Sequence, residues 1–364
     1  MIRSRLWLSL SLILALLATS ISLVAAQDEA AGGKLAEIIA RGQLNCGVSG
    51  NIPGFSNQNP DTGVWEGLDA DFCRVLAAAI FGPDYTEESV NFVPLTSDVR
   101  FTELQAGNVD VLHRNTTWTL TRDVTLGSDF GPTTFYDGQG ILVRIADGYT
   151  SMADMEGVTF CSTSGTTTEK NLTDAYRAAF GADPSLQLAT TPDQNVADLE
   201  GGACDALTSD KSQLAGLRTT LSDPSGWTIL PDTLSKEPLG PMYVGDDSQF
   251  GDIVNWSVYA TFQAEEYGVS SENVEELIAE QQALLDDDVE ANEDINLVRF
   301  LGLSEDNFGT ALGIPNSFAV DIVRAVGNYG EIYERNVTPL GIDRAGSLNA
   351  AWTDGGLLYS PAWR

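Results

Sequence analysis

Two stretches of the sequence match without a gap: Leu104-Gln-Ala-Gly-Asn-Val-Asp-Val-Leu112 and, 95 positions later, Leu199-Glu-Gly-Gly-Ala-Cys-Asp-Ala-Leu207. The same residue occupies four of the nine positions. Each stretch has the pattern of a helix end, a glycine stop and a buried strand. A polar residue follows three positions later, Asn115 in the first case and Asp210 in the second. The match predicts two similar units, although helix-to-strand turns can also resemble one another by chance.

Strand-like and helix-like segments alternate around both stretches. We expect strands at 44–49, 90–94, 109–112, 158–162 and 203–208, and helices at 69–81, 101–106 and 169–180. Such alternation predicts an α/β fold with parallel strands and crossover helices. Open sheets of this kind bind ligands beyond the carboxyl ends of their strands, where Asn115 and Asp210 are expected. The sequence after Pro241 is helical in pattern (253–267, 271–285, 316–326, 329–335), and we expect this tail to pack around one lobe.

The composition excludes several classes of partner. The chain has 364 residues, which favours two domains, and a formal net charge of −33. Such an excess of acid argues against a nucleic-acid partner and against a basic patch on an anionic membrane, since both need Lys and Arg. His113 is the only histidine, so a multi-histidine metal site is not expected. We expect no metal and no cofactor.

The N-terminus has the pattern of a secretory signal peptide. Arg3 and Arg5 precede an apolar run at 6–24, and small residues up to Ala26 follow it. We therefore expect residues 1–26 to be removed and the protein to lie in the periplasm or on the extracellular face of the cell membrane. The run is long enough for an uncleaved membrane anchor, which is the alternative.

Export to an oxidising compartment makes the four cysteines interpretable. An even number favours disulfides, and four cysteines allow three connectivities. The residues themselves do not choose among these three, and four buried thiols are the alternative. The cysteines are Cys46, Cys73, Cys161 and Cys204.

A capping-box spacing between Thr166 and Glu169 predicts a helix that starts at Thr166. The free N–H groups of Thr167 and Thr168 would then form an anion site at the positive end of the helix dipole. A carboxylate fits such a site, whereas no Walker lysine follows the glycine for a nucleotide phosphate. The alternative is an ordinary capped helix.

Charged residues that follow the predicted strands complement a zwitterion. Arg122 ends a segment that begins at Asn115 and includes Thr117, and arginine can hold a carboxylate with two parallel hydrogen bonds. Asp210 could hold an ammonium group. Taken singly, each charge could be an ordinary surface residue. Together with the Thr166 helix end they predict a site for an α-amino acid between two lobes.

The chain resembles the periplasmic substrate-binding proteins of polar and general L-amino-acid ABC transporters, and above all their long, general L-amino-acid-binding branch. The resemblance extends from about Gly33 to Arg364. It rests on these runs: Gly67-Leu-Asp-Ala-Asp-Phe-Cys73, Arg114-Asn-Thr-Thr-Trp-Thr-Leu-Thr-Arg122, Tyr136-Asp-Gly-Gln-Gly140, Gly165-Thr-Thr-Thr-Glu169, Cys204-Asp-Ala, Ser235-Lys-Glu-Pro-Leu-Gly-Pro241, Val326-Gly-Asn-Tyr-Gly-Glu331 and Trp352-Thr-Asp-Gly-Gly356.

This resemblance implies roles for the residues of the site. In the family the arginine at the position of Arg122 binds the α-carboxylate of the ligand, helped by the threonine at Thr117 and the backbone N–H at Thr167. The aspartate at Asp210 and the backbone carbonyl at Asn115 receive the α-amino group. For the side-chain pocket, Phe55 is our candidate aromatic. Smaller relatives have a further aromatic where this chain has Ser97, which suits a broad or polar pocket.

The resemblance also implies a two-lobed, hinged periplasmic-binding-protein fold of type II, with a mainly parallel sheet flanked by helices in each lobe. Lobe 1 would take residues 33–140 and 243–364, including a C-terminal helical extension, and lobe 2 would take 141–242. Pairing of cysteines within a lobe then implies the disulfides Cys46–Cys73 and Cys161–Cys204.

The expected function is that of a monomeric extracytoplasmic receptor, not an enzyme, which captures L-amino acids and delivers them to an ABC transporter permease. One alternative is a periplasmic enzyme on the same scaffold, since cyclohexadienyl dehydratases resemble this fold. No Gly-x-Ser-x-Gly elbow is present, and His113 is expected to be a packed residue of a strand end. Another alternative is a ligand-sensing module of a receptor.

Overall fold

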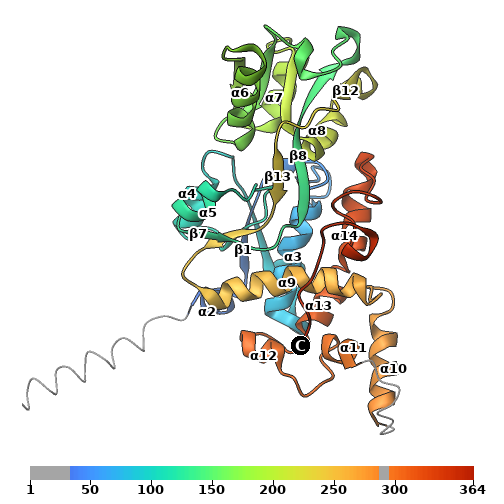
Figure 1. Ribbon diagram of the computed structural model, residues 1–364. Coiled ribbons are helices and arrows are strands. Elements are labelled where there is room, and N and C mark those ends of the chain that lie inside the picture. The colour runs from blue at the N-terminus through green and yellow to red at the C-terminus, as the bar shows by residue number, and fades with distance from the viewer. Residues whose placement is uncertain (1–32, 287–294) are drawn as a thin grey trace, which may run out of the picture.

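The computed structural model describes residues 33–286 and 295–364 of the chain (Figure 1). The expected signal segment, residues 1–26, lies outside these residues. Within the described ranges, no helix has the length and apolar character needed to cross a membrane.

The first sheet forms the core of one lobe and has the strand order β5-β1-β6-β14-β7. Its first three strands are parallel to one another, and β14 is antiparallel to both β6 and β7. A small three-stranded sheet, β2-β3-β4, lies in the loop after β1. These strands are β1 (Leu44–Val48), β2 (Asn51–Ile52), β3 (Ser56–Gln58), β4 (Trp65–Glu66), β5 (Val90–Pro94), β6 (Val111–Leu112), β7 (Ser128–Phe130) and β14 (Met242–Val244).

The second sheet forms the core of the other lobe and has the order β10-β9-β11-β8-β12. Strands β10, β9 and β11 are parallel, whereas β8 is antiparallel to β11 and β12. The start of β8 also pairs with β13. These strands are β8 (Phe135–Arg144), β9 (Thr159–Thr163), β10 (Ser185–Ala189), β11 (Ala206–Asp210), β12 (Trp227–Ile229) and β13 (Lys236–Leu239).

Each sheet is therefore mixed, with a parallel set of three strands and antiparallel neighbours. The antiparallel strands β8 and β14 belong to the two segments by which the chain passes between the lobes (Figure 1). In each lobe the strand of the connecting segment therefore runs against the parallel set: β14 is antiparallel to β6, and β8 is antiparallel to β11. The α/β class predicted from the alternating segments is confirmed.

Helices cover the sheets close to the predicted positions. Helix α6 begins at Thr167, one residue after the predicted start, because Thr166 is its N-cap and its hydroxyl accepts from the Glu169 N–H at 3.3 Å. The helices that precede β12 are α2 (Lys34–Arg41), α3 (Leu68–Phe81), α4 (Arg100–Gln105), α5 (Leu120–Thr125), α6 (Thr167–Phe180), α7 (Pro192–Glu200) and α8 (Lys211–Arg218).

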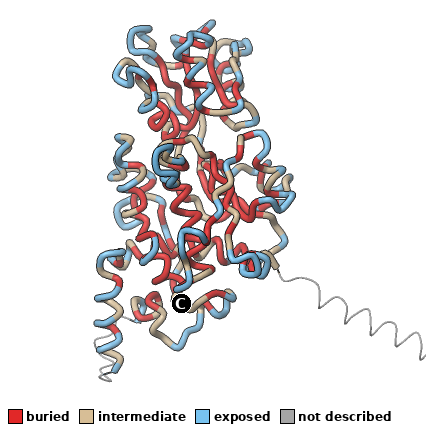
Figure 2. Tube along the Cα trace, turned by 180° about the vertical axis from the view of Figure 1, so that it is seen from behind, coloured by how far each residue is buried: buried red, intermediate tan, exposed pale blue. Residues whose placement is uncertain are grey.

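The C-terminal helices pack on the first lobe, and α3 lies at the centre of this packing. Every residue of α3 from Leu68 to Ile80 is buried, because the sheet covers one side and helices α9, α13 and α14 cover the other (Figure 2). The tail helices are α9 (Ser248–Glu266), α10 (Val274–Asp286), α11 (Ile295–Phe300), α12 (Phe308–Leu312), α13 (Phe318–Ala325) and α14 (Tyr329–Asn336).

Two disulfides lie within the lobes, and both pairings implied by the family resemblance are confirmed. Cys46 of β1 is bonded to Cys73 of α3, with a Cα–Cα distance of 6.0 Å. Cys161 of β9 is bonded to Cys204, just before β11, with a Cα–Cα distance of 5.6 Å. Neither bond joins one lobe to the other, so both leave the lobes free to move relative to each other.

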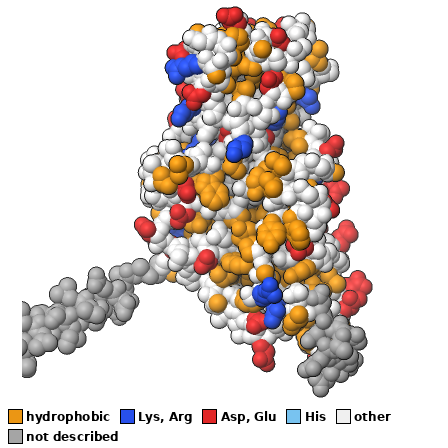
Figure 3. Space-filling model, in the orientation of Figure 1, with side chains coloured by type: hydrophobic (Ala, Val, Ile, Leu, Met, Phe, Trp, Pro, Cys, Tyr) orange, Lys and Arg blue, Asp and Glu red, His pale blue; other side chains and the backbone are white. Residues whose placement is uncertain are grey.

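The acidic side chains are dispersed. On the face drawn in Figure 3, Asp and Glu side chains are scattered over both lobes and do not form one continuous patch. The net charge of −33 therefore bears on solubility and on long-range electrostatics, and this face offers no single acidic binding surface.

Candidate functional site

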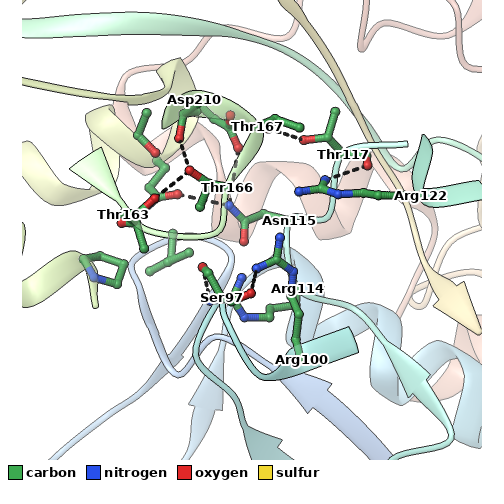
Figure 4. A pocket seen from close by; sticks show the side chains of 15 residues that line it. Ser97, Arg100, Arg114, Asn115, Thr117, Arg122, Thr163, Thr166, Thr167 and Asp210 are labelled. Carbon is green, nitrogen blue, oxygen red and sulfur yellow. Dashed lines mark hydrogen bonds between the residues drawn. The ribbon is translucent and has the colours of Figure 1, made fainter. Parts of the chain in front are cut away.

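A narrow cleft with a cavity volume of about 30 Å³ lies between the two lobes, beyond the carboxyl ends of β6 and β11. Residues from both lobes line it (Figure 4). Seven of the eight predicted binding residues are among them: Ser97, Asn115, Thr117, Arg122, Thr166, Thr167 and Asp210. The other lining residues are Ile52, Arg100, Arg114, Thr163, Thr168, Pro192, Ser209 and Gln213.

The lobes touch each other around this cleft. The Asn51 side-chain amide donates to the Asp193 carboxylate at 3.0 Å, which joins the first lobe to α7 of the second. A Cβ atom on Gly216 of α8 would lie only 2.5 Å from the Pro53 carbonyl oxygen. Only glycine permits this approach of backbone to backbone, so the sequence of α8 allows a tightly closed cleft.

Asn115 and Asp210, which follow the two matching stretches, face each other across the cleft. The Asn115 side-chain amide lies 3.4 Å from the Asp210 carboxylate and 3.1 Å from the Gln213 side-chain oxygen. Asn115 has a positive φ of 36°, which asparagine tolerates better than most residues. Its backbone N–H donates to the buried Asp69 carboxylate at 2.7 Å, and this bond holds the backbone turn in place.

Asp210 is the one acidic side chain among the lining residues. Burial raises its pKa well above the usual value, and the nearby carboxylates of Asp137 and Glu237 raise it further, against the opposing effects of Asn115 and Arg122. Within the part of the chain that the structure describes, the Oδ1 atom of Asp210 has no hydrogen-bond partner. An ammonium group placed at this atom would supply both a partner and a positive charge.

Arg122 belongs to α5 and is buried. It lies on the side of the cleft away from Asp210 (Figure 4). Its Nη1 donates to the Thr117 carbonyl at 2.8 Å, and its guanidinium carbon lies 5.1 Å from the centre of the Phe101 ring. Burial lowers the pKa of Arg122, while the charges of Glu237 and Asp210 act against that change. The hydrogen bond to Thr117 and the Phe101 ring together hold the guanidinium in one position.

Two further arginines, Arg100 and Arg114, line the cleft and were not identified from the sequence. Arg100 is only 3 % exposed and its Nη1 donates to the Ser97 carbonyl, with its guanidinium carbon 4.2 Å from the centre of the Phe101 ring. Burial lowers its pKa well below the usual value, and the positive charges of Arg114 and Arg122 lower it further. Its Nε has no partner among the described residues. The signal available in the sequence was its place three residues after Ser97, in a chain with few basic residues.

Arg114 differs from Arg100 because its Nε, as well as its Nη2, is hydrogen-bonded within the first lobe. Its Nε donates to the Leu95 carbonyl at 2.8 Å, and its Nη2 donates to the Ser97 hydroxyl at 3.0 Å. Burial lowers the pKa of Arg114 to about 10. Arg114 thus holds the wall of the cleft that contains Ser97, and Arg100 retains the free donor.

Phe55 does not line the cleft, so the structure does not place it where a ligand side chain would lie. It is 1 % exposed, and its ring packs edge-on against Phe135 at a centroid distance of 5.3 Å. The loop after β1 turns this aromatic ring into the core of the first lobe, because its apolar surface is better covered there. Ile52 of the same loop lines the cleft instead.

His113 is a packed residue. Burial lowers the pKa of its imidazole to about 3, and its ring stacks on Phe72 at a centroid distance of 5.9 Å. In residues 33–286 and 295–364, no group of three or more His, Cys, Asp or Glu side chains is placed to hold a metal ion.

Comparisons with known proteins identify the family of this chain. Residues 44–286 match the bacterial extracellular solute-binding proteins, family 3. The general L-amino acid-binding periplasmic protein AapJ of Rhizobium johnstonii is 43 % identical over 335 residues, which cover 91 % of this chain and 92 % of that protein. The glutamate/glutamine/aspartate/asparagine-binding protein BztA of Rhodobacter capsulatus is 42 % identical over 344 residues, 92 % of this chain and 94 % of that protein.

Among solved structures, an ABC transporter periplasmic binding protein from Brucella ovis with glutathione bound is similar to this chain. The TM-score is 0.83 at 38 % sequence identity, and the match covers 92 % of this chain and all of that one. The family match extends over more than half of the chain, and the similarity to AapJ extends over almost its whole length. The chain belongs to family 3 of the bacterial extracellular solute-binding proteins.

Proposed function

We propose that this protein is an extracytoplasmic receptor that binds L-amino acids between its lobes and delivers them to an ABC transporter permease. The observation that carries the proposal is the pair Arg122 and Asp210, two buried side chains of opposite charge in one cleft. Arg122 would bind the α-carboxylate with Thr117 and the N–H groups at the start of α6. Asp210 would bind the α-ammonium group together with the Asn115 backbone.

Acidic amino acids and their amides fit the remaining charge of the cleft. Three arginines and one carboxylate line it. A neutral zwitterion would pair with Arg122 and Asp210, and the lining residue Arg100, whose Nε has no partner among the described residues, would be left without a negative partner. A second carboxylate, or an amide oxygen, on the ligand's side chain would accept from that arginine. The name of the relative BztA supports this ligand class.

Ligand binding would close the two lobes like a hinge. We propose that residues 33–140 and 243–364 move as one lobe and residues 141–242 as the other, with β8 and β13 as the connecting strands. The contacts between Asn51 and Asp193 would form on closure and break on opening. We propose that the receptor works as a monomer, since both halves of the cleft come from one chain.

A thermal-shift panel of all L-amino acids tests the proposal, with glutathione included because the Brucella relative was solved with it. A ligand that binds only the folded state raises the unfolding temperature according to its concentration and Kd. We expect glutamate, aspartate, glutamine and asparagine to give the largest shifts. If no amino acid shifts the transition and calorimetry detects no binding, the proposal is wrong.

The enzyme alternative is separated by incubating the protein with prephenate and arogenate. A dehydratase would convert each of them to an aromatic product with release of water and carbon dioxide, whereas a receptor leaves its ligand unchanged. Product formation that scales with protein concentration would overturn the binding proposal. A ligand-sensing module would bind amino acids without supporting uptake by a permease, which transport into vesicles measures.

Replacing Arg100 with methionine is expected to lower affinity for glutamate and aspartate by at least about tenfold more than for neutral amino acids. The reason is that a side-chain carboxylate would lose its charged partner in a buried site, while the α-carboxylate would keep Arg122. Calorimetry on the ligand pair glutamate and glutamine measures the difference. An equal loss for both ligands would show that Arg100 does not distinguish a side-chain carboxylate from an amide, and would overturn the charge pairing.

A further inference from the structure

Glu237 is a buried carboxylate at the connection between the lobes, behind the wall of the cleft. It lies on β13 and is only 1 % exposed. Its Oε2 accepts hydrogen bonds from the hydroxyls of Thr117 at 2.6 Å and Thr167 at 3.2 Å. Its Oε1 accepts from the Asn171 side-chain amide at 2.9 Å and from the Ser235 hydroxyl.

The two threonines are also lining residues of the cleft, and they come from different lobes. Thr117 follows β6 in the first lobe, and Thr167 begins α6 in the second. Their hydroxyl oxygens lie 3.4 Å apart. A hydroxyl has one proton, so a threonine that donates to Glu237 cannot donate to a ligand at the same time.

Arg122 also interacts with Glu237, through the opposite charges of the two side chains. Of the groups that act against the lowering of its pKa by burial, Glu237 has the largest effect, ahead of Asp210. Glu237 thus provides an acceptor for both threonine hydroxyls and a negative charge for the arginine. The α-carboxylate of an amino acid would need these same three groups.

We propose that Glu237 is an internal carboxylate that competes with the ligand's α-carboxylate for Thr117, Thr167 and Arg122, and so lowers affinity and speeds release. This inference rests on the proposed function. The bonds of Asn171 and Ser235 to Oε1 hold the Glu237 carboxylate so that Oε2 faces the two threonines. When a ligand leaves, Glu237 satisfies the donors that the ligand had used, which reduces the cost of opening the cleft.

Such competition suits a receptor that must release what it binds. Charged donors that remain buried without a partner are costly, so a site with no internal carboxylate would hold its ligand more tightly. Glu237 would act as a positioning residue and not as a contact of the ligand. Its removal should therefore change affinity in the opposite direction to the removal of a binding residue.

The test is the variant Glu237→Gln, which keeps the shape of the side chain and removes its charge. We expect it to bind the best L-amino acid of the panel about tenfold more tightly, with a slower dissociation rate, because a like charge next to the carboxylate site is gone. Calorimetry gives the Kd, and stopped-flow tryptophan fluorescence gives the rate. Asp110→Asn is the matched control, since Asp110 is a buried carboxylate that does not line the cleft. This variant should bind the amino acid with the affinity of the wild type.

The design separates this inference from the proposed function. If the wild type binds no amino acid, the proposed function is wrong. If the wild type binds and a folded Glu237→Gln variant binds equally or more weakly, only the competition is wrong. A purely structural role would lower the unfolding temperature of the variant without tightening its binding.

A second measurement needs no folded variant. In a crystal structure of the wild type with the amino acid bound, the Thr117 hydroxyl should lie within hydrogen-bond distance of the ligand's carboxylate and should have left Glu237. A Thr117 hydroxyl that still donates to Glu237 in that complex would overturn the proposal. Glu237→Met, which is neutral and of similar size, serves as the second variant for the affinity measurement.

Discussion

Alanine in place of Arg122 is expected to weaken amino-acid binding by about 2–5 kcal/mol, which is about 30- to 5,000-fold in Kd. The ligand's α-carboxylate would remain in a closed cleft without its charged partner. The site cannot adapt easily, because Arg122 is buried and its neighbours Thr117 and Phe101 hold it in one place. Isothermal titration calorimetry with the strongest ligand of the thermal-shift panel measures the loss.

Two variants make this prediction specific. Arg122→Lys keeps the charge but loses the two parallel hydrogen bonds, so we expect an affinity between those of the wild type and the alanine variant. Arg177→Ala removes an exposed arginine of the second lobe, where its partner is Asp183, and should bind as the wild type does. An Arg122→Ala protein with normal unfolding and unchanged Kd would show that another group binds the carboxylate.

Asparagine in place of Asp210 is expected to cost at least about 2 kcal/mol of binding free energy, because the ammonium group would lose its negative partner in a buried site. The amide keeps the size of the side chain, so the loss reports charge and not packing. Asp174→Asn is the matched control, since Asp174 is an exposed carboxylate of the same lobe outside the cleft, and this variant should bind as the wild type does. Equal Kd values for Asp210→Asn and the wild type would rule out the ammonium role.

The same residue predicts a pH dependence. The pKa of Asp210 is raised by burial and then by Asp137 and Glu237, so the ligand-free carboxyl keeps its proton to a higher pH than usual. An ammonium group favours the ionised form, so binding releases a proton, and affinity should fall as the pH drops below the raised pKa. The slope should approach about tenfold per pH unit.

Calorimetry at several pH values, in pairs of buffers with different ionisation enthalpies, counts the protons released on binding. Asp137 must be considered, because burial raises its pKa to about 6. In the Asp210→Asn variant, the dependence of affinity on pH should disappear. Asp137 would still titrate in that variant. A dependence that persists unchanged in this variant would assign the proton to another group.

Local patterns predicted much of the fold. The strand at β1, the helices α3 and α6 and the polar residues after the two matching stretches follow from periodicity, caps and glycine stops, which depend on neighbours in the chain. The antiparallel partners of β8 and β14 did not follow, because the pairing of a strand that crosses between lobes is a long-range property. Nor did the burial of Phe55, since a loop aromatic can turn toward a ligand or toward the core with the same sequence.

The site shows the same division. The types and order of Arg122, Thr166 and Asp210 were sufficient to predict a binding site for a zwitterion, because charge and hydrogen-bonding capacity belong to the residues themselves. Arg100 and Glu237 were not recognised from the sequence, although Arg100 lies three residues after Ser97 and Glu237 lies in the run 235–241. Only the structure shows that both side chains are buried at the cleft or its wall, where a charge interacts more strongly than at an exposed position.

The sequence alone determined that two α/β units would present opposite charges beyond their strand ends, because strand periodicity, helix caps and side-chain chemistry are local. Only the tertiary structure decided that Asn115 and Asp210 lie 3.4 Å apart across one cleft. It also decided that Glu237 accepts from a threonine of each lobe. The physical reason is that these contacts depend on how two separately folded lobes are held together by β8 and β13, and no segment of the chain contains that information by itself.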